Sequence, residues 1–266
     1  MKVVGLIGFG AIGELVASHA SGLGAARIGP VLVRKDRANE IRPRLPRHAF
    51  PCEEIDALLA ARPDMIVECA GQDAVRAHAP AILAAGVDFM PISTGALADH
   101  DFRRRLIETA QASGARILIP AGATAGLDGL GALAVGGLTR VIYTSTKPPH
   151  AWRGTPAEAL IDLGALREPA TFYEGPADEA ALRYPKNANL AATIALAGAG
   201  FERTTVRLVA DPAATGNSGA IDAEGAYGRL SVRIGGVAMA GNPRTSAVTA
   251  LSIVRAIRNE SATFII

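Results

Sequence analysis

The chain has 266 residues, of which 49% are hydrophobic and 20% charged, and its formal net charge is +2. This length allows one large domain or two modest ones, and the scattered Lys and Arg residues argue against a nucleic-acid-binding protein. The two cysteines form neither a disulfide framework nor a C-x-x-C motif, and no apolar run approaches the roughly 18–20 residues of a membrane span. We therefore expect a cytoplasmic protein without a metal site, bound to neither nucleic acid nor membrane.

The amino terminus carries a glycine motif of the form G-x-G-x-x-G, made by Gly8, Gly10 and Gly13. It follows an apolar run and opens a helix-like run, which is the context of a dinucleotide-binding turn. Gly8 permits the tight turn, Gly10 lets the backbone approach a pyrophosphate, and Gly13 lets helix and strand pack closely. With Ala11 and Ile12 at the helix start, where N–H groups face the phosphates, these residues are predicted to bind NAD or NADP.

Strands and helices alternate at short spacing through residue 119. Helices are predicted over 13–23, 55–62, 74–85 and 100–113, and strands over 31–33, 65–67, 88–90 and 116–119. This alternation predicts a parallel, doubly wound sheet with right-handed crossovers, which is a Rossmann fold.

The segment after the strand at 31–33 bears on cofactor choice. An NAD-specific fold usually places an acidic residue there to bond the ribose 2′-hydroxyl, but this chain has Arg34 and Lys35. Arg34 could pair with a 2′-phosphate, which admits NADP, or both cations could face solvent. Asp36 keeps NAD possible.

Two further loops follow strands and belong to the predicted cofactor crevice. Cys69 and Ala70 come after the strand at 65–67, and Thr94 comes after the strand at 88–90. Loops at the carboxyl ends of parallel strands line this crevice, so all three residues are candidate cofactor contacts. The alternative for Cys69 is a small buried residue.

The pattern changes after residue 120. A small-residue segment leads into a helix ending near 137, and a capping box at Thr155–Glu158 predicts a helix start. A strand over 140–146, a helix over 190–197, strands over 204–210, 219–222 and 227–234, and a last helix to about 258 follow. We predict a dinucleotide-binding domain over 1–122, an α+β domain with an antiparallel or mixed sheet over 123–240, and a return of 241–266 to the first domain.

Five segments together resemble the L-aspartate dehydrogenase family: GFGAIG near the amino terminus, IPAGATAGLDGL at 119–130, TKPPHAW at 146–152, YPKNANLAATIALAG at 184–198 and NPRTS at 242–246. The resemblance implies NAD(P)-dependent oxidation of L-aspartate to iminosuccinate, which hydrolyses to oxaloacetate and ammonia or feeds NAD biosynthesis. It also implies a homodimer formed through the second domain. By motif match, Ala123 and Asn189 contact the cofactor near its nicotinamide end, and Asn189 is also a candidate helix cap.

One position departs from the family. The family usually carries a catalytic histidine in an N-x-H pattern, and Gly219 stands there, or Ala220 with a one-residue shift. We therefore expect slow oxidation, and a histidine restored at 219 is expected to raise the rate if the strand holds it toward the nicotinamide. The remaining candidates for acid/base catalysis and substrate binding are Lys186, Lys147 and His150, each of which could equally be a surface group.

Other functions remain open at this point. The chain could be a reductase of another imine or amino-acid substrate, or an NAD(P)-binding protein without turnover, for which the missing histidine is the main support.

Overall fold

The computed structural model describes every residue except 21, 23, 25, 186–188, 240–241 and 266. The chain divides into two compact units. Unit 1 comprises Met1–Pro120 and Thr249–Ile266, and unit 2 comprises Ala121–Val248.

Unit 1 is built on a five-stranded parallel sheet in the order β3-β2-β1-β4-β5. Its strands are β1 (Lys2–Ile7), β2 (Ala26–Leu32), β3 (Phe50–Cys52), β4 (Met65–Glu68) and β5 (Asp88–Pro91). The strand order reverses between β1 and β4, and ligands of open α/β sheets bind at the carboxyl ends of the strands on either side of such a point.

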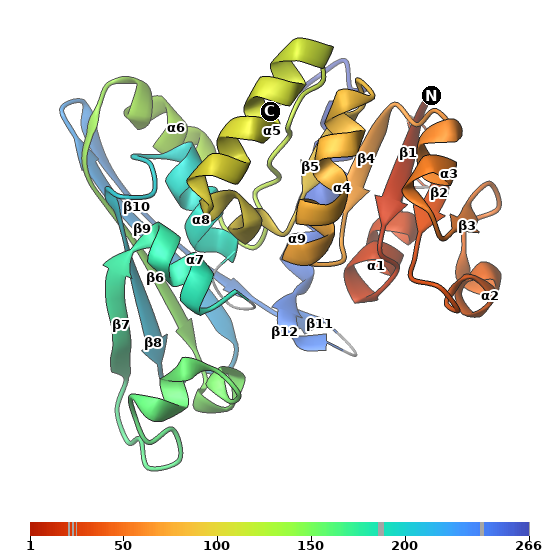
Figure 1. Cartoon of the computed structure of the whole chain (residues 1–266). Coiled ribbons are helices and arrows are strands. Elements are labelled where there is room, and N and C mark those ends of the chain that lie inside the picture. The colour runs from red at the N-terminus through yellow and green to blue at the C-terminus, as the bar shows by residue number, and fades with distance from the viewer. Residues whose placement is uncertain (21, 23, 25, 186–188, 240–241, 266) are drawn as a thin grey trace. The chain divides into compact units, whose positions relative to one another are not determined.

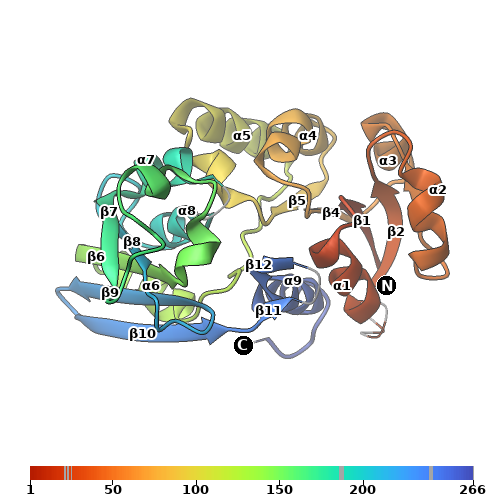
Figure 2. The ribbon, with the colours of Figure 1, turned by 90° about the horizontal axis from the view of Figure 1, so that it is seen from below.

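Helices cover both faces of this sheet (Figures 1 and 2). The helices are α1 (Ala11–Ala20), α2 (Ala38–Ile41), η1 (Arg42–Arg44), α3 (Ile55–Ala60), α4 (Gln72–Ala84), η2 (Thr94–Ala98), α5 (His100–Ser113) and α9 (Ala247–Asn259). Buried side chains of α1 and α9 pack on one face, against Val4 and Leu6 of β1, and those of α3, α4 and α5 pack on the other. The predicted doubly wound parallel sheet is confirmed.

The predicted strand over 116–119 is wrong. Ile117 makes an isolated parallel bridge with Phe89, through the Arg116 carbonyl and the Leu118 N–H, and the pairing does not continue into a strand. Of the strand predicted at 31–33, Val31 and Leu32 end the longer β2. The part of β2 before them contains Gly29 and Pro30 and therefore lacks the expected composition.

Unit 2 contains a mixed five-stranded sheet in the order β10-β9-β6-β8-β7, in which β6 and β8 are parallel and the other neighbours are antiparallel. Its strands are β6 (Leu138–Lys147), β7 (Ala170–Pro176), β8 (Thr204–Ala210), β9 (Asn217–Gly225) and β10 (Gly228–Gly236), with a separate pair β11 (Ala238–Met239) and β12 (Asn242–Ser246). The predicted mixed sheet of the α+β domain is confirmed.

Three helices, α6 (Leu127–Val135), α7 (Ala177–Arg183) and α8 (Asn189–Ala197), lie along one face of this sheet (Figure 1). The opposite face carries exposed ion pairs such as Arg207 with Glu174. Two short turns, η3 (Pro149–Trp152) and η4 (Pro156–Ala159), follow β6. At η4, Thr155 Oγ1 accepts a hydrogen bond from the Ala157 N–H, whereas Glu158 accepts one from Gly154 instead of completing the predicted capping box.

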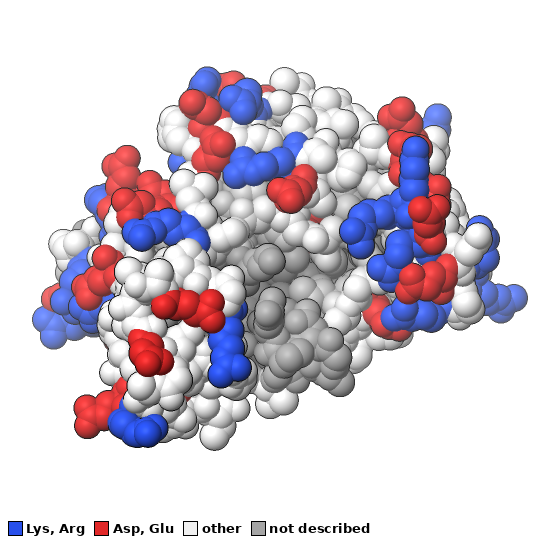
Figure 3. Space-filling model, turned by 60° about the horizontal axis from the view of Figure 1, so that its bottom comes forward, with Lys and Arg blue, Asp and Glu red and all other residues white. Residues whose placement is uncertain are grey.

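Two kinds of feature are absent from the described residues. None of their helices is long and apolar enough to span a membrane. They also contain no group of three or more His, Cys, Asp or Glu side chains placed to hold a metal ion. On the face shown in Figure 3, Lys and Arg side chains are interspersed with Asp and Glu.

Candidate active site

Each glycine of the amino-terminal turn meets a different steric demand. Gly8 has a φ of +90°, and a Cβ on it would lie 2.9 Å from the Ala70 Cβ. A Cβ on Gly13 would lie 2.5 Å from the Gly8 carbonyl oxygen, so α1 packs on the turn too closely for any side chain. A Cβ on Gly10 would meet no atom of the chain within 4 Å. The space beside Gly10 therefore suits a ligand such as a pyrophosphate.

A cavity of about 640 Å³ opens beside this turn. It is lined by residues from the carboxyl ends of β1 and β2, from the segments that follow β1, β2, β3 and β4, and from α4: Ile7, Gly8, Phe9, Gly10, Leu32, Val33, Arg34, Arg37, Glu53, Cys69, Ala70, Asp73, Ala74 and His78. Five of the predicted cofactor residues thus meet around one cavity, at the topological switch point of the sheet. The cavity and the start of α1 fit a dinucleotide with its pyrophosphate at the helix N-terminus.

Arg34 differs from the two cations that follow it. Lys35 lies 3.6 Å from Glu54, and Arg37 donates to Glu40 at 2.8 Å. Arg34 is exposed at the edge of the cavity and forms no ion pair with any residue that the structure describes. Its guanidinium is therefore available to an anionic ligand.

Glu68, which the sequence reasoning overlooked, holds the loops on one side of this site. It is the last residue of β4 and is fully buried. Its carboxylate accepts hydrogen bonds from the backbone N–H groups of Ala70 and Gly71 (2.6 Å each) and from the N–H and hydroxyl of Ser93 (3.1 and 3.0 Å). Burial raises the pKa of Glu68, and these bonds oppose the rise. A Glu at a strand end, followed by small residues, was the available signal.

The other predicted cofactor residues of unit 1 include two helix starts. Ala11 and Ile12 begin α1, and Thr94 begins η2 and is 1% exposed. Burial raises the pKa of the Cys69 thiol well above its usual value, so Cys69 is protonated and unsuited to act as a nucleophile.

Ala123 and Asn189 belong to unit 2. A Cβ on Gly122 would lie 2.8 Å from the Leu190 side chain, so the segment containing Ala123 runs directly beside the start of α8, where Asn189 is the first residue. The structure therefore brings these two motif residues into the same neighbourhood.

Lys147 is the most unusual polar residue of unit 2. It ends β6, at the carboxyl edge of the parallel β6–β8 pair, and is only 7% exposed. Its Nζ lies 4.7 Å from the centroid of the Trp152 ring, and the Trp152 indole N–H donates to the Val209 carbonyl at 3.0 Å. Burial lowers the pKa of Lys147 to about 8. A lysine with such a pKa is suited to exchange protons near neutral pH.

The other two catalytic candidates are less informative. His150 is exposed on η3. Lys186 lies outside the described residues, so its placement adds nothing to the site.

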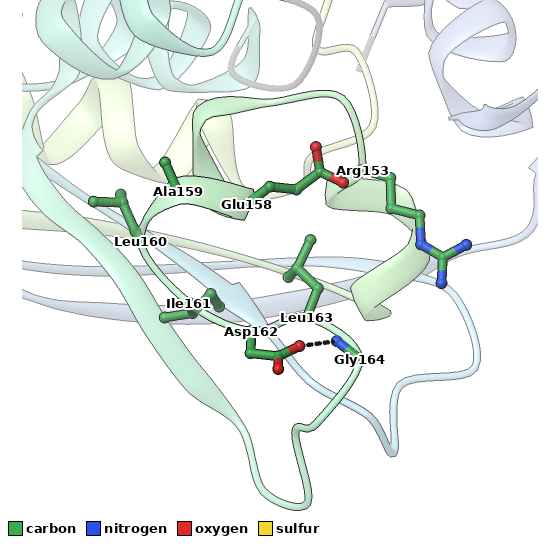
Figure 4. Close-up of a pocket in the computed structure, with 8 residues that line it drawn as sticks. All are labelled: Arg153, Glu158, Ala159, Leu160, Ile161, Asp162, Leu163 and Gly164. Atoms are coloured by element: carbon green, nitrogen blue, oxygen red, sulfur yellow. Dashed lines mark hydrogen bonds between the residues drawn. The ribbon is translucent and has the colours of Figure 1, made fainter.

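A second cavity, of about 480 Å³, is formed by residues 153–164 alone (Figure 4). Its two carboxylates serve their own loop, because Glu158 accepts from the Gly154 N–H and Asp162 from the Gly164 N–H. The Arg153 side chain points away from Glu158 (Figure 4). Two carboxylates and one outward cation disfavour a dianionic ligand, so this cavity is a poor substrate site.

Gly219 lies on β9 directly opposite Ser145 of β6. A Cβ on Gly219 would lie 3.3 Å from Cε2 and 3.5 Å from the hydroxyl oxygen of Tyr143, so the Tyr143 ring fills the space beside it. Ala220 faces the other side of the sheet, as alternation along a strand requires. A histidine at 219 would thus require Tyr143 to move.

Comparison with known proteins supports both halves of this description. Residues 4–120 match the family model of the homoserine dehydrogenase NAD-binding domain, and residues 128–260 match that of the carboxyl-terminal domain of aspartate dehydrogenase. An L-aspartate dehydrogenase of Ruegeria pomeroyi is 44% identical, over 97% of this chain and 92% of its own length. One from Pseudomonas aeruginosa is 43% identical over 96% of each chain.

This chain belongs to the L-aspartate dehydrogenase family. The crystal structure of aspartate dehydrogenase from Thermotoga maritima superposes with a TM-score of 0.76 at 29% identity, covering 100% of this chain and 99% of that one. The L-aspartate dehydrogenase family identity, together with the glycine turn, makes the protein an NAD(P)-dependent amino-acid dehydrogenase. The sequence-based expectation of family, fold and cofactor is confirmed.

Proposed function

We propose that the protein oxidises L-aspartate to iminosuccinate with NAD or NADP, and that iminosuccinate hydrolyses to oxaloacetate and ammonia. The observation that carries this proposal is the similarity to L-aspartate dehydrogenases of 43–44% over nearly the whole chain. No feature of the described residues favours the alternative of a reductase for another imine.

Unit 1 is proposed to bind the cofactor. Gly8, Gly10, Ala11, Ile12 and Gly13 would hold the pyrophosphate, with Cys69, Ala70 and Thr94 in the neighbouring loops and Arg34 at the 2′-position of the adenosine ribose. When bound, NAD(P)⁺ supplies the acceptor for the hydride on Cα of the substrate. In unit 2, Ala123 and Asn189 would approach the nicotinamide end.

Lys147 is proposed as the acid/base group, in the role for which the family usually has histidine. Its neutral amine would accept a proton from the substrate ammonium, which frees the nitrogen lone pair to form the C=N bond as hydride leaves Cα. The depressed pKa supports this role because a usable fraction of Lys147 is neutral near pH 7. His150 and Lys186 are the alternatives.

Four further features of the proposal rest on the sequence and on its family resemblance. These are a homodimer, a cytoplasmic location, a supply of iminosuccinate to NAD biosynthesis, and a division of labour between 1–122 with 241–266 for the cofactor and 123–240 for substrate and dimer contacts. Sedimentation of the purified protein tests the dimer directly.

The activity is tested by following NAD(P)H formation by the purified protein with L-aspartate and each cofactor. D-aspartate, L-glutamate and L-alanine are the matched substrates. Turnover with L-aspartate alone supports the proposal. If the protein binds the cofactor but oxidises none of these four amino acids, the proposal is contradicted, and the protein is a cofactor-binding protein without turnover.

A further inference from the structure

Tyr184 carries a buried hydroxyl without a hydrogen-bond partner. The residue follows α7, is 1% exposed, and its phenolic oxygen has no hydrogen-bonding atom within reach in the described part of the chain. Such an unpaired group costs about 1–3 kcal/mol, and phenylalanine would fill the same space without that cost. A buried hydroxyl kept under these conditions calls for an explanation.

Packing does not supply the explanation. Tyr184 belongs to an aromatic cluster with Trp152, Phe172 and Tyr173, at centroid distances of 6.5, 5.7 and 5.6 Å. Tyr173 in the same cluster is also buried, but its hydroxyl donates to the Pro176 carbonyl at 3.0 Å. The cluster therefore accommodates a paired phenol in one position and leaves the other unpaired.

Tyr184 and Lys147 share a neighbour, the Trp152 ring. The Tyr184 ring packs edge-on against Trp152 at an interplanar angle of 82°, and the Lys147 ammonium lies over the same indole. Burial raises the pKa of Tyr184, so its hydroxyl is a protonated donor at neutral pH. In an amino acid the amine and the α-carboxylate are attached to one carbon, so groups that bind them must lie close together.

We propose that Tyr184 is a substrate-binding residue whose hydroxyl donates a hydrogen bond to a carboxylate of the amino-acid substrate, while Lys147 faces the amine. This inference rests on the proposed function. The substrate carboxylate would be the hydrogen-bond partner that the described residues do not provide to the Tyr184 hydroxyl. Trp152 forms the wall that both groups share.

The test compares Tyr184→Phe with Tyr173→Phe, which is the same change at a paired phenol of the same cluster. Tyr184→Phe is expected to keep or raise the melting temperature and to raise KM for L-aspartate by about tenfold to a hundredfold, the range for a hydrogen bond to a charged group. NAD(P)H affinity should not change. Tyr173→Phe should lower the melting temperature, because the Pro176 carbonyl loses its donor, and should leave KM unchanged.

A second readout needs no turnover. With saturating NAD(P)⁺, succinate is expected to raise the melting temperature of the wild type and of Tyr173→Phe, and to have little effect on Tyr184→Phe. Equal succinate stabilisation of both variants overturns the inference, and so does a wild type that neither succinate nor L-aspartate stabilises.

The two readouts separate this inference from the proposed function. If succinate binds in a Tyr184-dependent way but L-aspartate is not oxidised, the proposed reaction is wrong and the carboxylate site stands. If L-aspartate is oxidised with the same KM by wild type and Tyr184→Phe, the reaction stands and the carboxylate site is wrong.

Discussion

Replacing Lys147 by arginine separates proton transfer from charge. Burial lowers the pKa of Lys147 from 10.5 to about 8, so about a tenth of it is neutral at pH 7 instead of about 0.03%. Arginine keeps the positive charge but stays protonated at every usable pH. We expect Lys147→Arg to lower kcat by roughly 10²–10⁴-fold, the usual contribution of a general acid/base.

The acid/base role of Lys147 also predicts the direction in which the rate changes with pH. Oxidation needs the neutral amine, so kcat/KM of the wild type is expected to rise with pH and level off above about pH 8. Lys147→Arg should lose that rise, whereas Lys2→Arg, in unit 1, should keep both rate and profile. A Lys147→Arg enzyme that retains the wild-type rate and profile would refute the acid/base role.

The same pKa makes a stability prediction. Between about pH 8 and 10.5 the unfolded chain binds a proton at Lys147 that the folded chain does not, so stability rises with pH across that window. Below it the buried ammonium costs roughly 3 kcal/mol. Lys147→Met is therefore expected to remove this rise in the free energy of unfolding between about pH 8 and 10.5, measured by urea denaturation, and an unchanged rise would contradict the lowered pKa.

Four other substitutions test the remaining site. Gly10→Val should fold normally but lose NAD(P)H binding, because its Cβ meets no atom of the chain within 4 Å; unchanged titration would rule out the pyrophosphate site. Arg34→Ala should weaken NADP binding by about 1.5–3 kcal/mol and NAD binding much less, whereas equal losses would mean that Arg34 only faces solvent. Glu68→Gln should weaken NAD(P)H binding in a fluorescence titration, because its one amide oxygen can accept from Ala70 and Gly71 but its NH₂ cannot accept from the Ser93 N–H; an unchanged Kd would mean that these bonds do not affect cofactor binding. Gly219→His should not raise kcat, because Tyr143 fills the adjacent space; an increase would argue against Lys147 as the acid/base group.

Local sequence patterns predict most of the sheet and the cofactor turn of unit 1, because the residues that indicate each element lie within or directly beside it. The glycine turn, the apolar strand before it and the small-residue loops at Cys69 and Thr94 all lie next to the elements that position them. Arg34 was identified for the same reason, since its position directly after β2 places it at the cavity. The isolated bridge at Ile117 shows the limit, because an apolar run does not reveal whether an edge position pairs continuously.

Unit 2 depends on contacts between distant segments, which no local pattern reports. Trp152 and Lys147 are close in the sequence, but Tyr184, which contacts the same indole, comes only after β7 and α7. Gly219 and Tyr143 are brought together only by the β6–β9 register, which pairs Gly219 with Ser145, two residues along β6 from Tyr143. The sequence therefore identified the absent histidine but not the Tyr143 ring that lies beside Gly219. In unit 1, Glu68 was overlooked for the same reason, because two of its four hydrogen bonds come from Ser93, 25 residues further along the chain.

The most direct test of the proposed reaction is the fate of the Cα hydrogen. L-aspartate deuterated at Cα is incubated with the purified protein and NAD(P)⁺, and the reduced cofactor is examined by mass spectrometry. We predict that deuterium appears in NAD(P)H as oxaloacetate and ammonia form. Reduced cofactor without deuterium, or no reduced cofactor at all, would contradict oxidation of L-aspartate by hydride transfer.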